Sequence, residues 1–240
     1  MKKTLVFTFL FMIITSTAFA ATHVTILNIH GDVRIRKGIE ENWSKAKQGM
    51  ILEDIDSIMT GKRASVVLRV DAKQSFTLQE NAMLDILDLR AISEQELFLF
   101  IMEQKLKKVE PASPKTKLRI GNVSVVHGEL KADVQKVDQV HSEDLWVQEK
   151  NGAISLYHQD YLTNSIMKMY RILDNYNDIE DCGEMHLYLG KAFESLHKTG
   201  QAIDSYRISI DRSSTGTCDT TEQLRIKNQS REALKRLSNK

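Results

Sequence analysis

Proline and cysteine are scarce in this 240-residue chain, which has two of each. Both prolines, Pro111 and Pro114, fall in the charged stretch 105–117, which we therefore predict to be a surface loop. No Cys-x-x-Cys pair is present, so a dithiol redox role is not expected. There is no run of basic residues either, and 33 Lys and Arg nearly balance 32 Asp and Glu. The composition therefore gives no electrostatic footprint for binding nucleic acid or anionic lipid.

Motifs of common catalytic and metal sites are also missing. The seven histidines are never three or four residues apart, and there is no His-Glu-x-x-His motif. No Gly-x-Ser-x-Gly motif is present, and neither Gly-Lys pair has the preceding glycine of a phosphate-binding loop. The acidic cluster at 53–56 lacks the spacing of a calcium loop. We therefore expect a non-enzymatic protein without a metal or cofactor.

The first 20 residues have the pattern of a secretory signal peptide. Lys2 and Lys3 form a charged start, 5–14 is a short apolar core, and Ala-Phe-Ala at 18–20 offers a cleavage site. The apolar core is too short for a comfortable membrane span, and no later stretch is long and apolar enough to supply one. We predict a signal peptide over 1–20 and a mature protein in the periplasm, or outside the cell, of a bacterium. An uncleaved membrane anchor is the alternative.

The stretch from Val24 to Leu87 consists of short runs in which apolar and polar residues alternate. The alternation is clearest at Ala64, Val66, Leu68 and Val70. This period places the apolar side chains on one face of a strand. Turn signals separate the runs, so the sequence predicts a series of short β-strands.

Strand-like patterns continue beyond this stretch. The apolar run 97–102 is interpreted as a buried strand, although periodicity alone does not distinguish it from a buried helix segment. A further strand pattern lies within 118–126, and Asn151-Gly152 between two apolar runs is a strong hairpin signal. We therefore predict an all-β domain over 22–156, folded as a sandwich, barrel or roll.

Ten residues of the first β stretch have a characteristic spacing: Trp43, Gly49, Leu52, Asp56, Ile58, Thr60, Leu68, Asp71, Leu78 and Leu84. This spacing resembles the FecR domain, in which G-D-x-I-x-T precedes alternating apolar residues and a D-G. The chain departs at two glycines of that pattern, because Ile55 precedes Asp56 and Ala72 follows Asp71. The resemblance implies a solenoid-like roll for the β domain.

From Tyr157 onward the apolar period becomes that of amphipathic helices. We predict helices over 161–176 and 184–197, another that begins near Ala202, and a last one over 221–237. Thr221 is the predicted N-cap of the last helix.

The middle pair of helices has a recognisable spacing of Leu189-Gly190, Phe193, Ala202 and Tyr206. This spacing resembles the tetratricopeptide repeat, in which small residues let two antiparallel helices approach while aromatic side chains fill the gap. The flanking helices resemble halves of neighbouring repeats. The resemblance implies a second, all-α domain of tetratricopeptide-like hairpins over 157–238, with a generic four-helix unit as the alternative. Stacked hairpins would bury a continuous core.

The two cysteines flank this helical pair. Cys182 lies just before one helix and Cys218 just after its partner. Those ends of an antiparallel hairpin are on the same side. In an oxidising compartment we therefore predict a Cys182–Cys218 disulfide, with two free thiols as the alternative.

Together these features favour an exported adaptor that binds an envelope protein or peptide, with no nucleic-acid partner. Cell-wall glycan binding, or envelope signalling through the β domain, is the alternative. The FecR signalling role needs a cytoplasmic segment before a membrane span, and the few residues before Leu5 are too short to supply one. In tetratricopeptide repeats the first helix of each hairpin lines the concave groove. That resemblance implies the following partner-binding residues: Glu184, Leu187, Lys191, Glu194 and Ser195.

Overall fold

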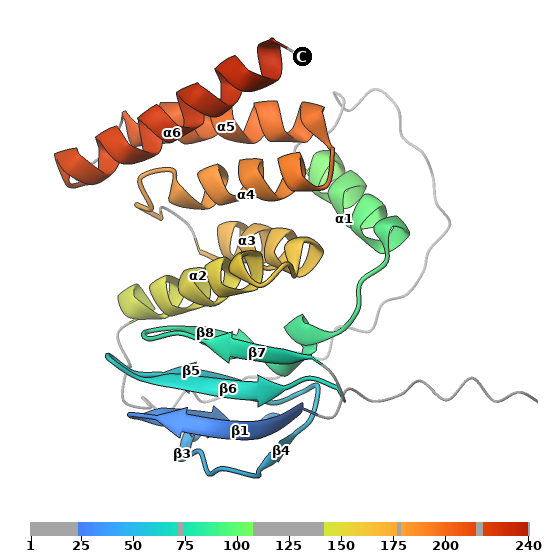
Figure 1. Ribbon diagram of the computed structural model, residues 1–240, viewed down its shortest axis with the longest axis vertical. Coiled ribbons are helices and arrows are strands. Elements are labelled where there is room, and N and C mark those ends of the chain that lie inside the picture. The colour runs from blue at the N-terminus through green and yellow to red at the C-terminus, as the bar shows by residue number, and fades with distance from the viewer. Residues whose placement is uncertain (1–23, 72–73, 108–141, 177–178, 215–217, 240) are drawn as a thin grey trace, which may run out of the picture.

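The computed structural model describes residues 24–71, 74–107, 142–176, 179–214 and 218–239. An N-terminal β region of two four-stranded antiparallel sheets is followed by a region of six helices (Figure 1). The predicted signal peptide and the strands expected within 118–126 lie outside the described residues.

The β region contains eight short strands and one 3-10 helix. These are β1 Val24–His30, β2 Val33–Arg36, β3 Ser44–Lys45, β4 Ile51–Leu52, β5 Ser57–Thr60, β6 Ser65–Arg69, β7 Ser75–Leu78, β8 Met83–Asp85 and η1 Ile86–Leu89. The first sheet has the order β4-β1-β6-β7, and the second has the order β3-β2-β5-β8. One hydrophobic core draws on both sheets, with Val66 and Leu68 of β6 and Ile35 of β2 fully buried. The predicted alternation over 64–70 is thereby confirmed.

The turn at 30–32 links the two sheets. β1 and β2 flank this turn, but each pairs within a different sheet. Gly31 has φ +75, and a Cβ there would lie 2.8 Å from the Cβ of Ala64. A glycine is therefore required by both the backbone conformation and the space.

Asp56 organises the turn before β5. Its buried carboxylate accepts the backbone N–H groups of Glu53 at 2.8 Å and Gly38 at 3.0 Å. The Lys37 ammonium lies 2.5 Å from the same carboxylate. Burial opposes ionisation, but Lys37 and these hydrogen bonds together lower the pKa of Asp56. The residue holds the turn even though Ile55 stands where the FecR pattern has glycine.

The helical region contains α1 Glu94–Lys107, α2 Ser142–His158, α3 Leu162–Asn175, α4 Glu184–Ser195, α5 Thr199–Ser213 and α6 Thr220–Ser238. The four helices predicted after Tyr157 are confirmed as α3 to α6. The predicted cap of the last helix is wrong, because Asp219 is the N-cap and its side chain accepts the N–H of Thr221 at 2.6 Å.

Two strand predictions are wrong. The run 97–102 lies inside α1, where Leu97 and Ile101 are buried one turn apart while Phe98 and Leu99 are exposed. The expected hairpin at Asn151-Gly152 is the middle of α2. The last strand among the described residues therefore ends at Asp85, and the predicted surface loop begins inside α1, with its remainder outside the described residues.

Helices α2 to α5 form two hairpins with the same geometry. Leu162 begins α3 and Thr199 begins α5, 37 residues later. The turn residues Asp160 and His197, also 37 residues apart, both have positive φ. The backbone N–H of Tyr161 donates to the carbonyl of Leu156, and the backbone N–H of Lys198 donates to the carbonyl of Phe193 in the same way. The two hairpins thus have matching turns 37 residues apart, and α6 stacks on the second hairpin, with α2, α4 and α6 one above another (Figure 1).

Helices α2 and α3 join this stack to the β region. A Cβ on Gly152 would lie 1.9 Å from the carbonyl oxygen of Met83 in β8, so the helix lies against the strand backbone. The side-chain amide of Gln159 caps the open edge of β7, accepting from the N–H of Thr77 at 2.7 Å and donating to its carbonyl at 2.8 Å. These contacts cover strand edges that would otherwise be free to pair.

Candidate binding groove on the helical region

A hollow of about 460 Å³ lies across the ends of α2, α4 and α6. Lys191, Glu194 and Ser195 of α4 line it, three of the five predicted partner-binding residues. We call this hollow the helical groove. Helices α2 and α4 come first in the two hairpins, and α6 follows the second.

The floor of the groove depends on the close approach of α4 and α5. A Cβ on Gly190 would lie 2.5 Å from the ring of Tyr206, so only glycine leaves room for that buried ring. The Tyr206 hydroxyl donates to Glu194 at 2.9 Å, and Arg236 of α6 pairs with the same carboxylate at 2.8 Å. Burial and the hydrogen bond to Glu194 raise the pKa of Tyr206, so its hydroxyl stays protonated as a donor.

Lys191 is the central cation of the groove. Its ammonium donates to the Gln229 side chain of α6 at 3.0 Å and lies 4.8 Å from the ring centroid of Tyr188. Burial lowers the pKa of Lys191, and the positive charge of Arg225 lowers it further. A partner carboxylate that reached this ammonium would favour its charged form.

The other two predicted residues lie outside the hollow. Glu184 stands at the opposite end of α4, where its carboxylate pairs with Lys150 of α2 and with Arg225 of α6. Leu187 has no exposed surface and is part of the helical core. The Glu184 side chain is engaged in ion pairs with α2 and α6, and the Leu187 side chain is buried in the core. Neither side chain is therefore available to a partner in this structure.

Sequence reasoning missed the contribution of α2. Tyr157 and His158 line the groove and lie 37 residues before Glu194 and Ser195. The repeat period would have placed them there, but the residues just before them were predicted to form a strand of the Asn151-Gly152 hairpin, so no helix was expected to end at His158. The same period places Glu232 of α6 37 residues after Ser195, and Glu232 also lines the groove.

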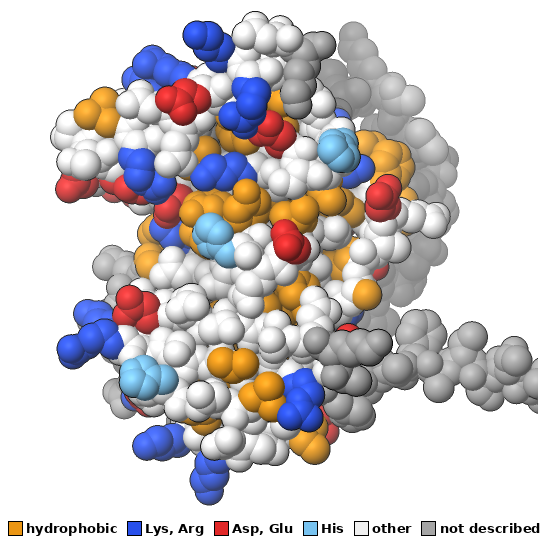
Figure 2. Space-filling view, in the orientation of Figure 1, with side chains coloured by type: hydrophobic (Ala, Val, Ile, Leu, Met, Phe, Trp, Pro, Cys, Tyr) orange, Lys and Arg blue, Asp and Glu red, His pale blue; other side chains and the backbone are white. Residues whose placement is uncertain are grey.

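The surface of the helical region combines charge with apolar area. Figure 2 shows acidic and basic side chains on the upper helical layers around a band of hydrophobic side chains. At the groove, Tyr157 supplies a half-buried ring whose pKa is raised by burial and by Glu194. Such a surface offers hydrogen-bond donors, charges of both signs and an aromatic face to an extended ligand.

The predicted Cys182–Cys218 disulfide is confirmed, with the two Cα atoms 6.0 Å apart. It joins Cys182, two residues before the start of α4, to the connection between α5 and α6. Among the described residues, no group of three or more His, Cys, Asp and Glu side chains could hold a metal ion. Within the same residues, no helix combines the length and apolar character needed to cross a bilayer.

Comparison with known proteins found no match to a family model, to a curated protein or to a solved structure.

Proposed function

We propose that this chain is an exported, non-enzymatic binding protein whose helical groove holds an extended segment of an envelope protein or peptide. The observation that carries the proposal is the alignment of α2, α4 and α6, whose ends share one hollow lined by charged and aromatic side chains. A groove that crosses successive hairpins suits a ligand longer than any single helix contact.

We also propose the finer architecture implied by the two resemblances. The close approach of α4 and α5 at Gly190 and Tyr206 supports a tetratricopeptide-like hairpin. The repeat of 37 residues between Leu162 and Thr199 is longer than the usual 34 of that family. The turn held by Asp56 supports a FecR-like β region.

Affinity capture from intact, crosslinked cells tests the groove. The tagged mature chain carries Lys191→Glu, which reverses the central charge, or the matched control Arg207→Glu, an exposed position on α5 away from the groove. We expect Lys191→Glu to reduce recovery of a specific envelope protein by about tenfold, as expected for reversing a half-buried charge contact. Arg207→Glu should leave recovery unchanged.

Reversal at Glu194 is a poorer test, because that carboxylate also holds Tyr206 and Arg236. Equal recovery by both charge reversals, with thermal melting unchanged, contradicts the groove assignment. If the envelope protein is still recovered after deletion of 157–240, its binding site lies in the remainder of the chain. Sedimentation with purified wall material and no protein recovery favours the glycan alternative.

A further inference from the structure

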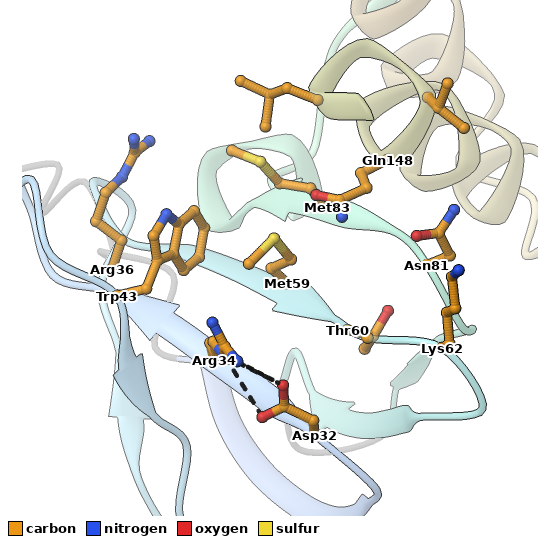
Figure 3. Close-up of a pocket in the computed structure, with 13 residues that line it drawn as sticks. Asp32, Arg34, Arg36, Trp43, Met59, Thr60, Lys62, Asn81, Met83 and Gln148 are labelled. Carbon is orange, nitrogen blue, oxygen red and sulfur yellow. Dashed lines mark hydrogen bonds and ion pairs between the residues drawn. The ribbon is translucent and has the colours of Figure 1, made fainter. Parts of the chain in front are cut away.

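A second hollow, of about 490 Å³, lies between the second sheet and α2 (Figure 3). Strands β2, β5 and β8 supply one wall and the N-terminal half of α2 supplies the other. We call this hollow the sheet pocket. It is separate from the helical groove, with which it shares no lining residue.

The middle of the sheet pocket is apolar. Met59 and Met83 project from the sheet between Trp43 on one side and Asn81 and Lys62 on the other (Figure 3). Methionine and indole side chains adapt to flat apolar groups, and methionine makes favourable contacts with aromatic rings. The pocket therefore offers a surface for a ring-sized apolar body.

The rim of the pocket is cationic. Among the described residues, Arg34, Arg36 and Lys62 line it, against one acidic residue, Asp32. Asp32 is already paired with Arg34 at 2.9 Å, and both side chains are half exposed. The Arg36 guanidinium lies 5.2 Å from the ring centroid of Trp43, next to the apolar wall. Arg36 and Lys62 therefore have no carboxylate partner among the described residues that line the pocket.

Two side chains that line the pocket each have a buried polar atom without a hydrogen-bond partner among the described residues. These atoms are Nε of Arg36 and Oε1 of Gln148. Gln148 points from α2 toward the strands (Figure 3). Unpaired buried polar atoms are unfavourable, so rotation of either side chain toward a polar ligand would recover a hydrogen bond.

We propose that the sheet pocket binds a small organic anion with a flat apolar body. The apolar body would lie over Met59 and against Trp43, with the anionic group next to Arg36 at the Trp43 end, while Lys62 at the opposite end adds to the positive potential of the pocket. The volume falls within the range of small-molecule sites, and convergent polar groups around an apolar wall are typical of them. Small-ligand binding of this kind is independent of the proposed peptide groove.

The test uses 8-anilinonaphthalene-1-sulfonate, an aromatic sulfonate with this chemistry, titrated into the mature chain. We expect one saturable site, with Trp43 fluorescence quenched in a Trp146→Phe background. Arg36→Gln combined with Lys62→Gln should weaken binding by about tenfold or more, since it removes charged contacts. The matched control, Arg69→Gln with Lys47→Gln, removes two exposed cations outside the pocket and should bind as the parent does.

The single variant Lys62→Gln separates an effect on binding from an effect on folding. We expect it to fold normally, because Lys62 is exposed and lies outside the strands. It should weaken binding severalfold with melting unchanged. Equal affinity of the pocket and control variants overturns the proposal, as does the absence of saturation by the probe. Loss of partner capture by Lys191→Glu with probe binding intact would confirm that the two sites are independent.

Discussion

At Gly152 the absence of a side chain sets how closely α2 lies against the second sheet. A methyl group there would meet the Met83 carbonyl at 1.9 Å, and that oxygen belongs to strand backbone that cannot move aside cheaply. We predict that Gly152→Ala lowers the free energy of unfolding by about 2–3 kcal/mol, since overpacking at a rigid contact outweighs the gain in helix propensity. Urea denaturation of the mature chain measures this.

Gly200 provides the matched control. It lies in the first turn of α5, and a Cβ there would meet no atom within 4 Å. Gly200→Ala should therefore be neutral or stabilise by up to about 1 kcal/mol, as expected for replacing an exposed helical glycine. If both alanine variants were equally stable, the close contact between Gly152 and β8 would not exist in solution.

The same residue explains why one sequence prediction failed. Asn151-Gly152 between apolar runs is a local hairpin signal, but its residues serve tertiary contacts instead. Gly152 provides the close approach to β8, and Asn151 donates from its side chain to the carbonyl of Asn81 at 2.8 Å. Local turn propensity does not reflect contacts with residues as distant in the chain as Asn81 and Met83, so helix α2 could not be predicted from this dipeptide.

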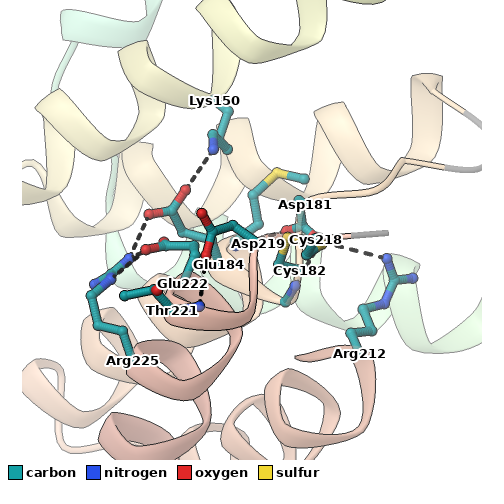
Figure 4. The surroundings of a disulfide bond; sticks show 12 residues. Lys150, Asp181, Cys182, Glu184, Arg212, Cys218, Asp219, Thr221, Glu222 and Arg225 are labelled. Atoms are coloured by element: carbon teal, nitrogen blue, oxygen red, sulfur yellow. Dashed lines mark hydrogen bonds and ion pairs between the residues drawn. A yellow bond between two sulfur atoms is a disulfide. The ribbon is translucent and has the colours of Figure 1, made fainter. Parts of the chain in front are cut away.

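At the scale of elements, the disulfide holds the N-terminal end of α4 to the connection before α6 (Figure 4). Its 36-residue separation closes a loop that contains both helices of the second hairpin. We predict that Cys182→Ser with Cys218→Ser lowers the free energy of unfolding by about 4 kcal/mol in the chain-entropy model. Alkylation without reductant should label neither cysteine in the purified mature protein, as mass spectrometry will show.

The neighbouring contacts offer a control for that experiment. Arg225 pairs with Glu184 and Glu222 next to the bridge (Figure 4). Arg225→Gln removes an ion-pair network but no covalent link, so it should cost much less than the double serine variant. Ready labelling of both thiols, or equal stability of the serine variant, would contradict a formed disulfide.

The four C-terminal helices could be predicted because their signals are internal to each helix or hairpin. Gly190 and Tyr206 lie within one hairpin, and the apolar period of each helix faces its sequence neighbours. Helix α1 was not predicted because its apolar run 97–102 is continuous in the sequence. In the structure, Leu97 and Ile101 are buried, but Phe98 and Leu99 are apolar and exposed, so the run shows no helical period. The contribution of Tyr157 and His158 of α2 to the groove was missed for a separate reason, because the run just before them was predicted to be a strand of the Asn151-Gly152 hairpin.

At the scale of the whole molecule, one cluster of charges joins the β region to the helices. Lys168 of α3 is almost fully buried and pairs with Asp88 at 2.6 Å and with Asp85 at 3.3 Å. Arg171 supplies a second cation to Asp88 at 2.9 Å. Burial alone would lower the pKa of Lys168, but the two carboxylates raise it. The contact between the regions is therefore polar and directional as well as apolar.

This arrangement makes the stability of the junction depend on pH. Burial opposes ionisation of Asp85, but Lys168 and the hydroxyl of Ser57 lower the pKa of its carboxyl below the usual 3.8. A carboxyl whose folded pKa is lowered stabilises the protein above its unfolded pKa, and this stability is lost as the pH falls through the folded pKa. The pKa of Lys168 is raised, so its stabilising effect is present at lower pH and is lost only as the pH rises above 10.5.

We therefore predict that Asp85→Asn lowers the free energy of unfolding at pH 7 by about 1–2 kcal/mol, through a lost charged hydrogen bond. The variant should also lose less stability than the parent as the pH falls below 3.8, because the titrating group is gone. Urea denaturation at pH 3 and pH 7 measures both effects. Asp32→Asn, which removes an exposed carboxylate paired with Arg34, should change stability by less than about 0.5 kcal/mol at either pH. Parallel acid profiles for the parent and Asp85→Asn would show that the junction does not depend on this carboxylate, and the apolar and amide contacts of α2 and α3 would then hold the two regions together.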